Sequence, residues 1–132
     1  MSTDTLLITE YLSKESNVIL AFLFGSKSKA KTSQFSDYDI GIWVKNESDI
    51  TLINKIWEDL ECMLHANVDL IILNIAKPTI AWSAMRGIKL CIKDFQLFIN
   101  LFLSISREAE DNQDFIIELY EKKWGLQNGK FE

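Results

Sequence analysis

The chain has 132 residues, 48% of them hydrophobic, with five glycines and one proline, a composition typical of a packed globular domain rather than a disordered chain. Its formal net charge of −5 argues against broad, sequence-independent binding of nucleic acid, which needs many basic contacts to phosphates. No apolar run reaches the about 20 residues of a membrane span, and residues 1–15 lack the basic start and cleavage site of a signal peptide. We therefore expect a cytoplasmic domain with no membrane partner and no direct nucleic-acid partner.

The first part of the chain predicts one helix and two strands. Residues 6–12 show the spacing of a short amphipathic helix, with apolar positions at Leu6, Leu7, Tyr11 and Leu12. The run VILAFLF at 18–24 has the length of a strand and is continuously apolar, which is typical of a strand buried on both faces. A second strand is predicted at 39–44, after a polar stretch.

The middle of the chain alternates between helical and strand patterns. A helix is expected after Ser48 or Asp49, because either side chain suits the cap of a helix. Its core stripe is Ile53, Ile56, Trp57, Leu60 and Leu64. An apolar strand at 68–73, a short proline-initiated helix at 78–85 and a short edge strand at 89–92 are predicted to follow.

The last part of the chain is predicted to be helical and to complete a single domain. Residues 94–124 favour one long helix or two, and residues 125–132 are expected to be a frayed tail. The aromatic stripe of this region, Phe95, Phe98 and Phe102, is interpreted as core, with an interface to a partner protein as the alternative. The whole order predicts one α+β domain over 1–132, sandwich-like, with a small mixed β-sheet, helices packed against it and a core at about 15–93.

Several conspicuous residues are expected to serve structure rather than chemistry. Cys62 and Cys91 lie in apolar patterns without metal-ligand spacing, which predicts two packed, reduced thiols. His65, the single histidine, is expected to end a helix. Trp82 is interpreted as a core or interface aromatic, with stacking on a base as the alternative. Arg86, beside Gly87, is interpreted as a partner in a surface ion pair, with contact to a phosphate as the alternative.

The chemistry of the sequence is concentrated in one motif and one distant acid. Gly25 and Ser26 follow the first strand, and after ten intervening residues Asp37 and Asp39 lie at the start of the second. Side chains alternate along a strand, so these two aspartates share a face, and Asp69 interrupts the apolar strand 68–73. Three carboxylates that converge from neighbouring strands require divalent cations between them, and oxygen-only ligands favour Mg²⁺ or Mn²⁺. The motif therefore predicts a site for two metal ions beside a turn that approaches phosphate.

The lysine-rich stretch after Gly25 is expected to meet phosphate without being a P-loop. Lys27 and Lys29 follow the Gly-Ser pair directly, in a chain that is acidic overall. The letters GSKSKAKT at 25–32 nearly match the P-loop pattern. A P-loop leads into a long helix, whereas the next strand follows Thr32 too soon, and Ala30 replaces a required glycine.

These residues carry a family resemblance. A buried strand, a Gly-Ser pair, a ten-residue gap, an Asp-x-Asp pair and a later strand aspartate resemble the nucleotidyltransferase fold of the polymerase-β superfamily, over about residues 1–90. The small size resembles its minimal nucleotidyltransferase (MNT) branch. The resemblance implies that the metal ligands and catalytic acids are Asp37, Asp39 and Asp69, of which the last helps to deprotonate the acceptor. It implies that the triphosphate is contacted by Gly25 and Ser26, while Lys29 and Ala30 stand where the family usually has arginine and glycine.

The MNT proteins that this chain resembles commonly act as antitoxins to a HEPN-domain ribonuclease toxin. The resemblance implies an Mg²⁺-dependent adenylyltransferase that moves AMP from ATP to a hydroxyl of the cognate HEPN toxin, expected to be a tyrosine, and releases pyrophosphate. The chain lacks the Arg…His signature of HEPN ribonucleases, so it is expected to be the antitoxin. Two alternatives remain open: an antitoxin that acts by binding alone, and a small-molecule nucleotidyltransferase of the aminoglycoside type.

Overall fold

The computed structural model describes residues 3–25 and 38–110, of which the side chains are described up to Arg107. In chain order the elements are α1 (Thr3–Lys14), β1 (Val18–Phe24), β2 (Tyr38–Val44), α2 (Ile50–Leu64), β3 (Val68–Ile72), the 3-10 turn η1 (Leu73–Ile75), α3 (Pro78–Met85), β4 (Ile88–Ile92) and α4 (Phe95–Glu110). The strands and helices predicted from periodicity are confirmed. The predictions for residues 111–132, a second C-terminal helix and a frayed tail, concern residues outside the described ranges.

The strands form a mixed sheet in the order β3-β2-β1-β4. Strand β1 pairs antiparallel with both β2 and β4, whereas β2 and β3 are parallel. This confirms the predicted small mixed sheet. The antiparallel pairing of β1 with β2 also agrees with the rejection of a P-loop, because a helical crossover joins parallel strands.

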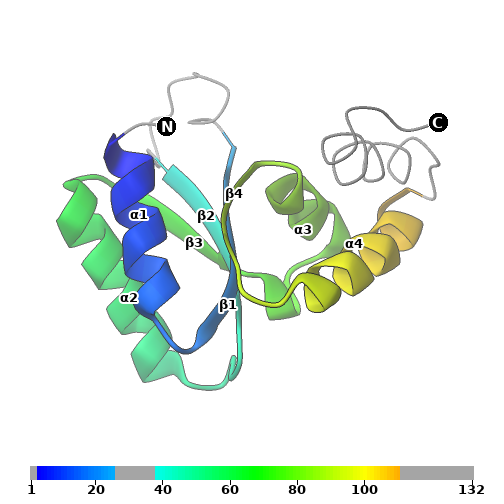
Figure 1. The fold of residues 1–132 in the computed structure, drawn as a ribbon, viewed down its shortest axis with the longest axis horizontal. Coiled ribbons are helices and arrows are strands. Elements are labelled where there is room, and N and C mark those ends of the chain that lie inside the picture. The colour runs from blue at the N-terminus through cyan, green and yellow to red at the C-terminus, as the bar shows by residue number, and fades with distance from the viewer. Residues whose placement is uncertain (1–2, 26–37, 111–132) are drawn as a thin grey trace.

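Helices cover both faces of the sheet, as Figure 1 shows. Helices α1 and α2 lie on one face, over a core that includes Ile40, Ile56 and Leu70. Helices α3 and α4 lie on the other, over Phe22, Phe98 and Phe102. The continuously apolar sequence of β1 follows from this arrangement, because a central strand with helices on both faces buries side chains in both directions.

The helix ends follow local chemistry. The side chain of Asp49 accepts a hydrogen bond of 3.1 Å from the backbone N–H of Leu52 and so caps α2, as predicted. His65 ends the same helix in the left-handed conformation, with φ of 51°, and its backbone N–H donates to the carbonyl of Glu61. Pro78 opens α3 at its first position, where no intrahelical donor is lost.

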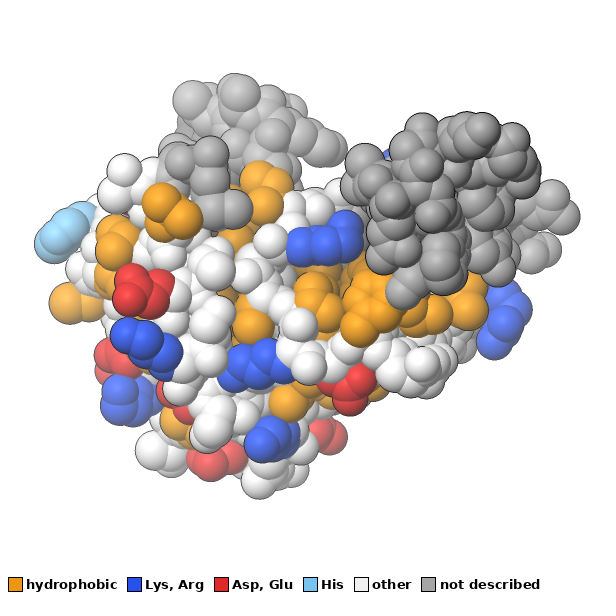
Figure 2. Space-filling model, viewed as in Figure 1, with side chains coloured by type: hydrophobic (Ala, Val, Ile, Leu, Met, Phe, Trp, Pro, Cys, Tyr) orange, Lys and Arg blue, Asp and Glu red, His pale blue; other side chains and the backbone are white. Residues whose placement is uncertain are grey.

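Three side-chain expectations need correction. On α1 the buried positions are Thr5, Ile8 and Leu12, whereas Leu6 and Leu7 are 53% and 38% exposed; Leu6 and Leu7 therefore do not belong to the core face of the helix. Cys91 is buried as expected, but Cys62 is exposed, because the apolar stripe of α2 passes beside it. Phe98 and Phe102 are core residues and Phe95 is 43% exposed. Hydrophobic side chains remain visible along α4 in Figure 2.

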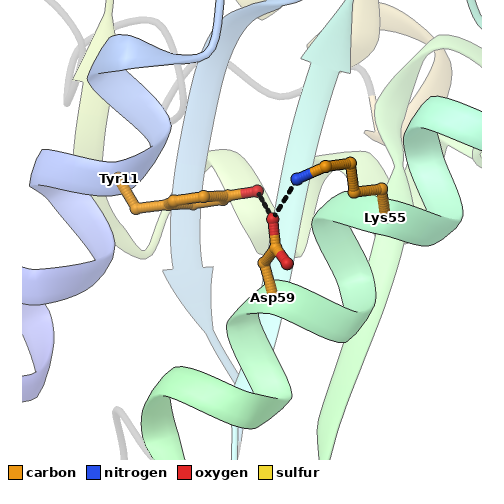
Figure 3. A network of polar contacts seen from close by, with 3 residues as sticks. All are labelled: Tyr11, Lys55 and Asp59. Atoms are coloured by element: carbon orange, nitrogen blue, oxygen red, sulfur yellow. Dashed lines mark hydrogen bonds and ion pairs between the residues drawn. The ribbon is translucent and has the colours of Figure 1, made fainter.

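A polar contact joins the two helices on one face of the sheet (Figure 3). The hydroxyl of Tyr11 on α1 donates to Oδ2 of Asp59 on α2 at 2.6 Å, and Lys55 Nζ lies 2.8 Å from the same oxygen. Burial, followed by this hydrogen bond, raises the pKa of Tyr11. The hydrogen bond from Lys55, followed by the one from Tyr11, lowers the pKa of Asp59. The contact therefore favours a protonated tyrosine and an ionised aspartate.

We expect Tyr11→Phe to lower the free energy of unfolding by about 1 kcal/mol near neutral pH, because a hydrogen bond to a charged acceptor is lost while the ring stays in place. Since the pKa of Asp59 is lowered on folding, the contact stabilises the protein above the ordinary aspartate pKa. The difference in free energy of unfolding between the unmodified protein and Tyr11→Phe should shrink as the pH falls through the lowered pKa of Asp59. Urea unfolding at neutral and acid pH measures it; a difference that grows in acid would contradict the assignment.

Candidate active site

The sequence motif and the distant acid meet at one edge of the sheet. Strand β1 ends at this edge, at Phe24, and because β2 is antiparallel to β1 it begins there, with Asp39 opposite Phe24. Strand β3 is parallel to β2 and so begins at the same edge. Gly25, Asp39 and Asp69 are therefore brought together by the pairing of strands that are distant in sequence.

Asp39 and Asp69 are direct register partners on neighbouring parallel strands. Adjacent strands lie about 4.8 Å apart, and partners in register point to the same side of the sheet. The neighbours Ile40 and Leu70 belong to the core beneath α1 and α2, so both carboxylates lie on the face that carries α3 and α4. The predicted convergence of acids from two strands is confirmed for this pair.

Gly25 lies directly against the Asp39 carboxylate. Its φ is +82°, a conformation that side chains with a Cβ rarely adopt. A Cβ placed on Gly25 would overlap Oδ2 of Asp39 and would stand 2.8 Å from its Cγ. Glycine at this position therefore serves two purposes: it makes the turn possible and leaves room for the acid.

The electrostatics of the acid pair fit a cation-binding site. Burial, and then the neighbouring charge of Asp39, raises the pKa of Asp69. A divalent cation between the two carboxylates would remove the repulsion, and both donors are the oxygen ligands that Mg²⁺ prefers. Within residues 3–25 and 38–110 no cluster of three or more His, Cys, Asp or Glu residues is placed to hold a metal, so the described site contributes a pair of acids.

We expect Asp69→Asn to raise the melting temperature of the metal-free protein by about 1–2 °C at pH 7, since the exposed carboxylate is only partly desolvated. The raised pKa means that the native state binds this proton more tightly than the unfolded chain does. The destabilisation caused by the ionised Asp69 carboxylate is therefore absent at low pH and develops as the pH rises through the raised pKa. Thermal scans in chelator should show the gain at pH 7 and its loss toward about pH 4; a lower melting temperature at pH 7 would contradict it.

The other predicted site residues, Ser26, Lys27, Lys29 and Asp37, lie outside the described residues. Tyr38, between the two motif aspartates in sequence, is buried on the opposite face and contacts Asp4 of α1, as its alternation predicts. Two residues at this edge were not assigned to the site from the sequence: Arg86 and Gly87, where α3 returns to the end of β1. The apolar spacing of a helix does not predict which strand the residues after its end will pack against.

Comparison with known proteins identifies the class of protein that this sheet and its acid pair belong to. Residues 7–96 match the family model described as polymerase beta, nucleotidyltransferase. The matched residues include Gly25, Asp39 and Asp69. The chain belongs to the polymerase beta nucleotidyltransferase family. A comparison with curated protein sequences finds no match.

Solved structures share the fold over almost the whole chain. A chain from a toxin–antitoxin structure with AMP-PNP superposes with a TM-score of 0.63 at 18% identity and covers 97% of this chain and 98% of its own. A chain from the MntA–HepT toxin–antitoxin structure gives 0.60 at 16% identity, covering 96% and 95%. A chain from the Shewanella oneidensis complex of tri-AMPylated HEPN toxin with MNT antitoxin gives 0.57 at 20% identity, covering 87% and 98%. At these identities the likeness establishes the fold.

The structure also bears on membrane insertion. None of the helices in the described ranges is both long enough and apolar enough to span a bilayer.

Proposed function

We propose that this protein is the antitoxin of a toxin–antitoxin pair and transfers AMP from ATP to a hydroxyl group of a HEPN-domain toxin, with Mg²⁺ as cofactor. The observation that carries the proposal is the pairing of Asp39 with Asp69 beside Gly25. Family membership supports nucleotide transfer. The similar structures support the rest, since one contains AMP-PNP and another contains an AMPylated HEPN toxin with an MNT antitoxin.

In the proposed reaction the acceptor hydroxyl attacks the α-phosphorus of ATP. A new bond joins the hydroxyl oxygen to phosphorus, the bond from phosphorus to the β-phosphate bridging oxygen breaks, and pyrophosphate leaves. Asp69 accepts the hydroxyl proton, a role that its placement beside Asp39 at the edge of the sheet allows. The backbone turn at Gly25 approaches the triphosphate without steric hindrance.

The metal ligands in this proposal are Asp37, Asp39 and Asp69. When Mg²⁺ is bound, it neutralises charge on the triphosphate and favours ionisation of the acceptor hydroxyl. Asp39 holds its carboxylate over the Gly25 turn, and Asp69 presents its own beside it. The lysines Lys27 and Lys29 remain proposed phosphate contacts, on the basis of their position after the Gly-Ser pair in the sequence.

Two labelled forms of ATP test the proposal directly. The purified protein is incubated with Mg²⁺, the HEPN-domain toxin that the proposal makes its partner, and ATP labelled on either the α- or the γ-phosphate. Transfer of AMP predicts label on the partner from α-labelled ATP alone, with release of pyrophosphate. Label from γ-labelled ATP would identify a kinase, and no label from either form would refute the proposal.

The role of catalysis in neutralisation needs a separate test, because a protein that covers a toxin protects cells without chemistry. The double substitution Asp37→Ala with Asp39→Ala is expected to retain binding to the toxin and to lose protection. If growth of cells that express the toxin is restored equally well by this variant, binding alone is sufficient. Transfer onto an aminoglycoside instead of the protein partner would point to the small-molecule alternative.

A further inference from the structure

Helix α3 ends at the edge of the sheet that carries the acid pair. Near its end, Ala84 lies over Gly41 of β2, where a Cβ on the glycine would stand 3.2 Å from the alanine Cβ. The chain then reaches Gly87, which packs on the last residues of β1: a Cβ at Gly87 would overlap the Leu23 carbonyl and stand 2.8 Å from Phe24 Cβ. Phe24 is the register partner of Asp39, so α3 ends at the level of that acid.

Arg86 is held at this edge by its backbone and by an aromatic ring. It is the C-cap residue of α3, and its backbone N–H donates to the carbonyl of Trp82 at 3.1 Å. Its guanidinium lies 4.8 Å from the centre of the Trp82 ring. Trp82 in turn packs edge-on against the core residue Phe102, with ring centres 5.9 Å apart. The arginine is exposed, and one face of its guanidinium rests on the ring of Trp82.

We propose that Arg86 binds the β- and γ-phosphates of the nucleotide and so positions the α-phosphate over the acid pair. The inference rests on the proposed nucleotide transfer. It follows from the placement of Arg86. Arg86 is next to Gly87 in sequence, and Gly87 packs against Phe24. Phe24 precedes Gly25 in sequence and is the register partner of Asp39. A guanidinium presents a planar set of N–H donors that matches phosphate oxygens.

The charges around this edge agree with a triphosphate that lies across it. Asp39 and Asp69 supply negative charge for a metal ion, whereas Arg86 and Lys89 supply positive charge on the same face of the sheet. Lys89 is the register partner of Phe22, and its Nζ lies 5.7 Å from the centre of the Phe98 ring. The separation of acids from bases suits a ligand whose α-phosphate needs metal and whose outer phosphates need direct cationic contacts.

The test compares ligands that differ only beyond the α-phosphate. Binding of AMP-PNP and of AMP, each with Mg²⁺, is measured by calorimetry for the full chain and for Arg86→Ala, Arg86→Lys and Arg107→Ala. Arg107 is an exposed arginine in the last turn of α4, so its replacement is the matched control for charge. Arg86→Ala is expected to weaken AMP-PNP binding about tenfold to a hundredfold and to leave AMP binding within about twofold.

The conservative variant separates recognition from general charge. Arg86→Lys should recover part of the affinity for AMP-PNP, because lysine retains the charge but loses the planar donors. In the transfer reaction, Arg86→Ala should raise the KM for ATP and leave the KM for the acceptor protein unchanged. Circular dichroism and thermal unfolding verify that each variant is folded, which is expected because the replaced side chain is exposed.

The outcomes distinguish this inference from the proposed function. Unchanged AMP-PNP binding in Arg86→Ala, or equal losses for AMP-PNP and AMP, would overturn the role of Arg86 while Asp39-dependent transfer still stood. The same loss in Arg107→Ala would reduce the effect to net charge and would also overturn it. If the unmodified protein neither binds AMP-PNP nor transfers AMP, the proposed function fails and the role of Arg86 fails with it.

Discussion

Asp39→Asn is expected to reduce AMP transfer about a thousandfold or more while the protein remains folded. The substitution keeps the size of the side chain, so the space above Gly25 stays filled. It removes one of the two carboxylates that lie side by side on β2 and β3. Loss of a single group that stabilises charge in a transition state typically costs 10²–10³ in rate, about 3–4 kcal/mol. A metal ligand is expected to lie at the upper end of that range.

The loss of transfer can be assigned to catalysis only if the folding and the metal binding of Asp39→Asn are measured as well. Label transfer from α-labelled ATP gives the rate, and calorimetry with Mg²⁺ and AMP-PNP gives the affinity. Glu58→Gln is the matched control, because it removes a carboxylate from the exposed outer surface of α2. Retention of more than about a tenth of the rate by a folded Asp39→Asn variant would remove Asp39 from the catalytic machinery.

Gly25→Ala is expected to damage stability and activity together. The positive φ of 82° disfavours any residue with a Cβ, and the added carbon would overlap the Asp39 carboxylate. We expect the free energy of unfolding to fall by about 2–4 kcal/mol. Since misplacement of a catalytic group by about 1 Å can cost a hundredfold, transfer by the remaining folded protein should fall by about that factor.

A double-mutant cycle shows whether the damage acts through Asp39. When Asp39→Ala removes the carboxylate, the overlap with Oδ2 and Cγ disappears. The cost of the backbone conformation remains, together with a tight contact of 3.0 Å to the Cβ of residue 39. The combined variant should therefore be less destabilised than the sum of the two single variants, by about 1–2 kcal/mol. Strict additivity in urea unfolding would mean that the glycine is needed for the turn alone and does not make room for the acid.

Local patterns predicted the elements well because their causes are local. The continuous apolar run of β1 and the stripe of α2, including its Asp49 cap, depend on residues a few positions apart. The same reasoning was wrong for Leu6, Leu7 and Cys62. An apolar residue in a helix indicates its buried face only when the neighbouring elements are known, and these side chains lie where no described element covers them enough to bury them.

The amino-acid sequence alone was enough to recognise the motif and its chemistry: a glycine turn after a buried strand, followed by carboxylates in a strand and a later lone acid. Which acids are neighbours, and which other residues lie near them, depends on how distant segments pair and pack. The partnership of Asp39 with Asp69 depends on the parallel register of β2 and β3, and the arrival of Arg86 depends on the path of α3 across the sheet. Both arise from hydrogen bonds and packing between segments far apart in the chain, which periodicity does not encode.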